Sequence, residues 1–91
     1  MTDRPSHVIG PFGEKLTLDR LPARDTIRWT VRRKAEVVAA VQGGLLTFEE
    51  ACSRYALAME ELISWQGAHQ SSGMRGLRIT RSQRYRERYR Y

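Results

Sequence analysis

The chain has 91 residues, of which 41% are hydrophobic and 29% charged, and its net charge is +6. This length predicts one small domain with loose ends, and no apolar run approaches the ~20 residues that would span a bilayer. The first residues lack the apolar stretch of a secretory signal. A single cysteine, Cys52, excludes an internal disulfide, and with only His7 and His69 beside it no zinc-ligand spacing exists. We expect a cytoplasmic, metal-free protein.

Residues 1–27 are predicted to form an extended, turn-rich arm. This segment has no sustained hydrophobic periodicity, and a helical turn in the stretch "TLDRLP" is left open. It contains several residues that break regular structure, namely Pro5, Gly10, Pro11, Gly13 and Pro22. Short apolar pairs such as Val8-Ile9 are expected to pin parts of the arm to the body.

The first predicted helix spans residues 31–42. Thr30 is a suitable N-cap, and Gly43-Gly44 ends the helix because glycine adopts the left-handed conformation there without steric cost. A single apolar stripe at helical spacing is expected to face the core. It consists of Val31, Ala35, Val38, Val41 and Leu45.

Two further helices are predicted, one over residues 47–55 and one from about Ala58 to Gln70, where Ser71-Ser72-Gly73 ends it. Thr47 and Glu50 have the spacing of a capping box. A helix-turn-helix needs a small residue at the helix crossing, a compact residue at the reversal, and apolar residues after it and on the second helix. The residues in these places are Ala51, Cys52, Tyr55, Ala56, Leu57, Leu62 and Trp65.

Ala56 departs from the usual helix-turn-helix pattern. Glycine is common at this position because the residue often needs a positive φ, so a gentler turn is expected around the alanine. Trp29 and Trp65 are interpreted as core anchors, since an indole buries ~200 Å². The alternative to a helix-turn-helix is a three-helix bundle with no groove-reading role.

The C-terminal residues carry the whole net charge. Residues 1–74 contain nine basic and nine acidic residues, whereas residues 75–91 contain seven arginines and one glutamate. Tyrosines alternate with these arginines, and few apolar residues remain to be buried, so disorder is expected after about Thr80. Such a segment can neutralise phosphates and stack on exposed bases.

Several blocks of the sequence carry a resemblance to a known family. The stretch "EACSRYALAMEELISW" resembles the helix-turn-helix of insertion-sequence transposases and of the Trp-repressor-like superfamily. The blocks "RRKAEVV", "GGLL" and "EEAC-RY", together with Trp65, are similar to the small alphaproteobacterial SciP family, over about Gly10 to Tyr85. The resemblance implies a helical transcription regulator that restrains promoter activation by the CtrA response regulator. Direct DNA binding has also been proposed for that family.

These observations together predict the fold and its boundaries. We expect an all-α fold, a small Trp-repressor-like helix-turn-helix domain over residues 28–77. An N-terminal arm over residues 1–27 precedes it, and a disordered, arginine-rich tail over residues 78–91 follows it.

The start of the third helix is acidic, which argues against a DNA-reading role. Glu60 and Glu61 oppose the electrostatic attraction to phosphate that dominates DNA affinity. They also complement the helix dipole, so simple helix stabilisation is an alternative. Contact with a protein partner is the second interpretation, and base reading is the third. With the exposed polar residues of that helix, the candidate partner-contact residues are Glu60, Glu61, Ser64 and Gln66.

A second cluster is basic and lies around the start of the first helix. Cations there face the positive end of the helix dipole, which is unfavourable, so an anionic partner is favoured slightly over a merely solvated surface. The candidate DNA or phosphate contacts are Arg28, Arg32, Arg33, Lys34, Arg78, Arg81, Arg84, Arg86, Arg88 and Arg90.

The function predicted from these features is transcription regulation by protein contact. We expect the chain to restrain a CtrA-like response regulator at promoters, associated with the nucleoid, while its basic residues contact promoter DNA. A direct sequence-specific DNA-binding repressor is the first alternative, and a transposase-derived structural domain is the second. No nucleophile–base pair or phosphate-binding glycine loop occurs, so we expect neither an enzyme nor a cofactor, membrane or small-molecule substrate.

Overall fold

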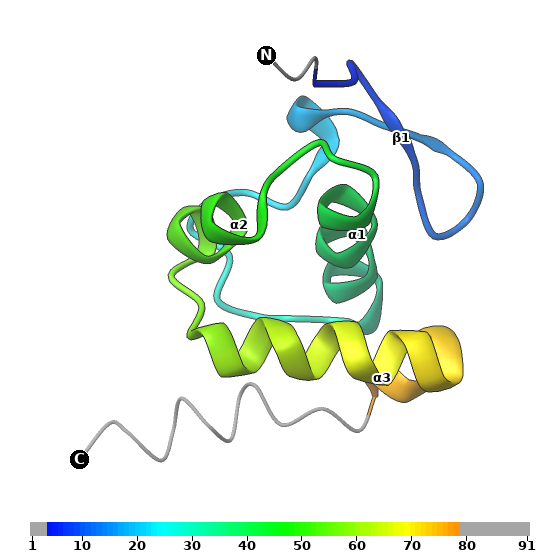
Figure 1. The fold of residues 1–91 in the computed structure, drawn as a ribbon, viewed down its shortest axis with the longest axis vertical. Helices are drawn as coiled ribbons and strands as arrows, with labels where there is room; N and C mark the ends of the chain where they lie inside the picture. The colour runs from blue at the N-terminus through cyan, green and yellow to red at the C-terminus, as the bar shows by residue number, and fades with distance from the viewer. Residues whose placement is uncertain (1–3, 79–91) are drawn as a thin grey trace.

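A computed structural model of the protein describes residues 4–78, which fold into a small helical body with a short hairpin (Figure 1). In chain order the elements are β1 (Val8–Ile9), β2 (Lys15–Leu16), the 3-10 helix η1 (Leu18–Arg20), α1 (Val31–Gln42), α2 (Phe48–Tyr55) and α3 (Met59–Leu77). The longest helix, α3, runs along one side of the body, and α1 and α2 both lie on its inner side. None of the described helices is long and apolar enough to cross a membrane.

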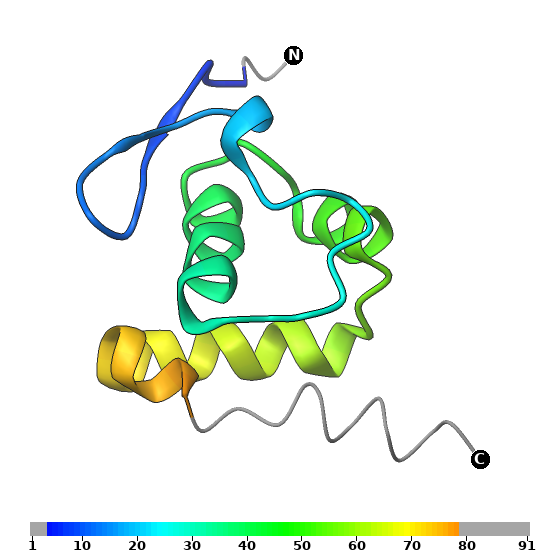
Figure 2. The same cartoon turned by 180° about the vertical axis from the view of Figure 1, so that it is seen from behind.

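The N-terminal arm is more regular than the sequence predicts. β1 and β2 pair antiparallel, with Val8 opposite Leu16. The fold is mostly helical, in line with the predicted all-α class, and the arm adds a short two-stranded sheet. Each strand has only two residues, too few for an alternating pattern to be visible in the sequence. Val8, Leu16 and Leu21 are buried. The hairpin lies beside α1, on the side away from α2, as Figure 2 shows from behind.

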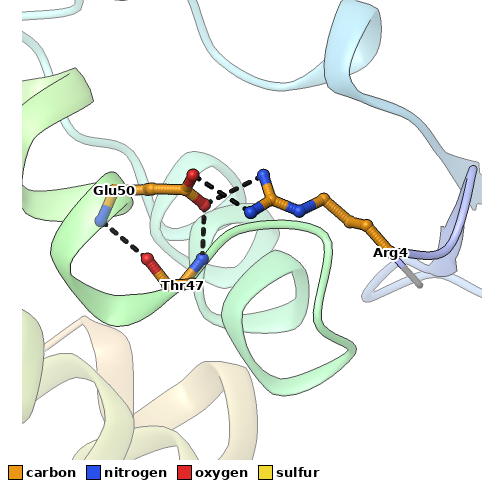
Figure 3. A network of polar contacts seen from close by, with 3 residues as sticks. All are labelled: Arg4, Thr47 and Glu50. Carbon is orange, nitrogen blue, oxygen red and sulfur yellow. Dashed lines mark hydrogen bonds and ion pairs between the residues drawn. The ribbon is translucent and has the colours of Figure 1, made fainter. Parts of the chain in front are cut away.

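A bidentate ion pair also ties the arm to α2. The Arg4 guanidinium donates to Glu50 Oε2 at 3.1 Å, and its second terminal nitrogen lies 3.0 Å from Glu50 Oε1 (Figure 3). The predicted capping box is confirmed, because Glu50 N donates to Thr47 Oγ1 and Thr47 N donates to Glu50 Oε1. The Thr47 amide first, and then Arg4, lower the pKa of Glu50. Residue 4 therefore lies against the body, beside the helix cap.

An aromatic cluster fills the space between the three helices. Trp29 packs edge-on against Tyr55 at 5.1 Å between ring centroids, and against Trp65 at 5.0 Å. Trp29 and Trp65 are both buried, which confirms their interpretation as core anchors. The Tyr55 hydroxyl donates to Pro22 O at 2.8 Å. This contact fixes the connection before α1 against α2.

The helix boundaries follow the predicted caps, with one extension. Thr30 Oγ1 accepts from Arg33 N, as expected for the N-cap of α1, and Gly44 follows α1 with φ of +86°. The predicted stop at residues 71–73 is a local break, because Ser72 and Gly73 have non-helical dihedrals. The helix then resumes for one turn, and that turn carries the buried Leu77.

Ala56 corrects the expectation of a gentler turn. The residue lies in the left-handed conformation, with φ of 53° and ψ of 44°, between α2 and α3. The backbone N–H of Ala56 and that of Leu57 both donate to Cys52 O, which is the hydrogen bonding of a helix C-terminus closed by a left-handed residue. The chain therefore keeps the tight reversal and places an alanine where glycine would be unstrained.

The strain at this turn predicts that Ala56→Gly stabilises the protein. A left-handed conformation costs an L-residue about 1–2 kcal/mol, and the greater freedom of glycine in the unfolded chain offsets part of that relief. We expect a gain of about 0.5 kcal/mol in the free energy of unfolding, measured by urea denaturation with an unchanged m value. Ala39→Gly, inside α1, is the control and should destabilise by about 1 kcal/mol. A loss of stability in Ala56→Gly would contradict the left-handed assignment.

Candidate interaction surfaces

The outward side of α3 at its start forms the first candidate surface. Met59 and Ile63 are 60% and 55% exposed, one helical turn apart. Glu60 and Ser64 are exposed beside them, whereas Leu62 and Trp65 point into the core. We call Met59, Glu60, Ile63 and Ser64 the α3 outer face. It combines apolar side chains with one negative charge.

Two of the predicted partner contacts do not belong to that face. Glu61 is only 5% exposed, and its Oε1 accepts the N–H of Ala58 at 3.3 Å. Glu61 therefore caps the start of α3 from inside, and its assignment as a partner contact is wrong. Gln66 is half-buried. Of the four predicted residues, only Glu60 and Ser64 are exposed.

Lys34 is also buried, although the sequence predicts it as a phosphate contact. Its side chain is 5% exposed, its Nζ donates to Leu77 O at 3.2 Å, and it lies 5.8 Å from the centroid of the Trp65 ring. Burial lowers the pKa of Lys34, while the charge of Glu61 opposes that shift. A buried ammonium group bonded to the backbone of α3 cannot reach a phosphate. Lys34 instead joins α1 to the end of α3.

The remaining predicted arginines of α1 are on the surface. Arg33 Nη1 donates to Arg28 O at 2.9 Å, and both residues are exposed. Arg32 is engaged locally, since its Nε lies 3.4 Å from Glu36 Oε2 and its guanidinium lies 5.0 Å from the centroid of the Phe12 ring. Arg28 and Arg33 are therefore better placed than Arg32 to meet an anion.

The structure adds a residue that the sequence reasoning missed. Arg75 lies with Arg78 around a shallow hollow of about 300 Å³, whose other lining residues are Val31 and Met74. The sequence predicts that the third helix ends at residues 71–73, so it assigns Arg75 to no helix. The predicted contacts Arg81, Arg84, Arg86, Arg88 and Arg90 lie outside the described residues.

The described part of the chain contains no group of three or more His, Cys, Asp or Glu side chains that could hold a metal ion. Burial, and then the charges of Glu49 and Glu61, raise the pKa of Cys52. A raised pKa keeps the thiol protonated and makes it a weak nucleophile. The candidate functional features of the described residues are the α3 outer face and the exposed arginines Arg28, Arg33, Arg75 and Arg78.

Comparison with known proteins gives the family. A family model described as "Protein of unknown function (DUF1153)" matches residues 1–86. The chain belongs to the DUF1153 family. No curated protein matches this DUF1153 chain.

A solved structure resembles this DUF1153 protein over almost its whole length. It is the NMR solution structure of the protein coded by gene RHOS4_12090 of Rhodobacter sphaeroides, a Northeast Structural Genomics target. The two sequences are 42% identical, and the alignment covers 98% of this chain and 94% of the other, with a TM-score of 0.71. The fold described above is therefore similar to one determined experimentally.

Proposed function

We propose that this protein is a transcription regulator that restrains a DNA-bound response regulator of the CtrA type by protein contact. In this proposal the α3 outer face binds the regulator, and basic residues elsewhere hold the assembly on promoter DNA. The pair α2–α3 serves as a Trp-repressor-like helix-turn-helix whose second helix meets a protein. The resemblance of the sequence to the SciP family supports this choice of partner.

The composition of the α3 outer face carries the proposal. A helix that reads the major groove presents Arg, Lys, Asn, Gln, Ser or Thr at its start. Here Met59 and Ile63 are exposed, Glu60 lies between them, and α3 has no lysine or arginine before Arg75. Two exposed apolar side chains beside a carboxylate suit a protein surface that is basic and partly apolar. The DNA-binding domain of a response regulator offers such a surface, because it is itself basic.

A titration of labelled promoter DNA tests the proposal. DNA would be titrated with this protein, with the regulator, and with both, at a low and at a physiological salt concentration. We expect this protein alone to bind DNA weakly and with a steep loss on adding salt, and to bind the regulator when DNA is absent. Sequence-specific binding by this protein alone at physiological salt would instead establish a direct repressor.

A further inference from the structure

The start of α1 and the end of α3 meet at one place, although they are far apart in the sequence. The ammonium group of Lys34 donates to Leu77 O, and Val31 shares a hollow with Met74, Arg75 and Arg78. In Figure 1 the last turn of α3, coloured orange, folds back at the end of the helix that is far from α2. This junction places Arg75 and Arg78, at the end of α3, beside the first residue of α1.

Two glycines build the fold-back of α3. Gly73 has φ of 61° and ψ of −147°, a conformation that is essentially restricted to glycine. A Cβ atom at Gly76 would clash with the backbone oxygen of Ala68, so only glycine allows the last turn to pack this closely. Leu77 is then fully buried, and Arg75 and Arg78 remain exposed. The fold-back therefore fixes the backbone positions of two arginines beside α1.

The charge at this junction is unbalanced. Residues 26–35 and 62–78 contain five arginines and one lysine but no aspartate or glutamate. The nearest acids along α1 and before it are Glu36, which pairs with Arg32, and Asp25. The charge of Glu61, which is buried in α3, raises the pKa of Lys34 and so opposes the effect of burial. The positive end of the α1 dipole adds to the arginine charge. Repulsion of this kind is relieved when an anion binds.

We propose that this surface binds the phosphodiester backbone of duplex DNA. The helix-junction surface consists of Arg75 and Arg78 around the apolar floor of Val31 and Met74, together with the exposed Arg28 and Arg33, which lie before and in the first turn of α1. Guanidinium groups match phosphate oxygens through paired N–H donors, and the apolar floor suits the deoxyribose between successive phosphates. Five more arginines follow Arg78 in the sequence.

The position of the surface deepens the proposed function. The α3 outer face begins at Met59, and α3 runs roughly 20 Å at 1.5 Å per residue before the break at Ser72. Duplex DNA and a protein partner can therefore occupy opposite ends of α3 at the same time. The proposal assigns DNA contact to the junction and leaves the protein contact to the outer face. The role of this surface in holding a regulator on a promoter rests on the proposed function, whereas its binding to duplex DNA does not.

The test compares two double variants of the full chain that lose the same charge. Arg75→Gln with Arg78→Gln alters the junction, whereas Arg20→Gln with Arg24→Gln alters exposed arginines elsewhere. A labelled duplex of mixed sequence would be titrated by fluorescence anisotropy at several salt concentrations. A plot of log affinity against log salt has a negative slope, and its magnitude should decrease by about 0.9 for each phosphate that the protein no longer neutralises. For the junction variant we expect the magnitude of the slope to decrease by about 1.8, and the affinity to be at least about tenfold lower at 0.1 M salt.

The control variant should change the slope and the affinity far less. Equal losses in the two variants would overturn the proposal, because bulk charge would then explain binding. Competition by polyglutamate as effective as that by unlabelled duplex would also overturn it. In a titration followed by amide NMR, residues 31–33 and 73–78 should shift when duplex is added. Binding of the junction variant to the regulator without DNA should be unchanged, so failure of the proposed function would be seen separately.

Discussion

Lys34→Ala is expected to lower the free energy of unfolding by about 3–5 kcal/mol. The ammonium group is buried, donates to Leu77 O, and interacts with the charge of the buried Glu61. Its removal leaves a carboxylate in the interior without this cation, and it leaves the Leu77 carbonyl without this donor. The loss of the alkyl stem also opens space beside Trp65. Urea denaturation at neutral pH measures the change.

The chain offers a matched control, because Lys15 is its other lysine and lies exposed in β2. Lys15→Ala should change the free energy of unfolding by no more than about 0.5 kcal/mol. Lys34→Met keeps an apolar stem of similar length, so we expect it to recover part of the loss but not the hydrogen bond to Leu77. If Lys34→Ala were as stable as Lys15→Ala, the ammonium group would be a surface cation, as its charge alone suggests.

The helix caps are predicted correctly from the sequence of this protein, whereas the burial of Lys34 and Glu61 is not. Helix caps are local, so Thr30, Thr47 and Glu50 mark helix starts that the structure confirms. The side of a helix on which a charge lies depends on what packs against it, and charge alone suggested the surface for Lys34 and Glu61. Their positions carried a clue: Lys34 lies three residues after Val31 and four before Val38, and Glu61 lies four before Trp65. Both therefore share the buried stripe of their helix.

Other features could not be predicted from local pattern. A two-residue strand has too little periodicity to be seen in the sequence, and the hairpin of β1 and β2 depends on the burial of Val8 and Leu16 in the core. The sequence predicts a helix end at residues 71–73, because nothing local indicates that the helix resumes or that Leu77 is buried. Arg75 was consequently missed as a member of the basic surface. These elements are determined by tertiary contacts over many residues.

Replacing Met59 and Ile63 together by serine is expected to weaken binding to the response regulator by about thirtyfold or more. We take a cost of about 1 kcal/mol or more for truncating each apolar side chain at the centre of an interface, so the two losses together come to about 2 kcal/mol. About 1.4 kcal/mol corresponds to tenfold in affinity. Both side chains are more than half exposed in the free protein, so the fold should lose little stability. Titration of the regulator's DNA-binding domain, without DNA, measures the change.

The control uses the same chemical change at other exposed positions. Ile9→Ser with Ile27→Ser removes side chains that are 65% and 80% exposed, on β1 and on the connection before α1. This variant should bind the regulator as the natural protein does. The Met59/Ile63 variant should in turn keep the duplex affinity and salt slope of the natural protein, because the helix-junction surface is intact. Opposite behaviour of the outer-face and junction variants would show that one helix serves two partners. If the outer-face variant instead lost sequence-specific DNA binding in the absence of the regulator, α3 would be a groove-reading helix after all.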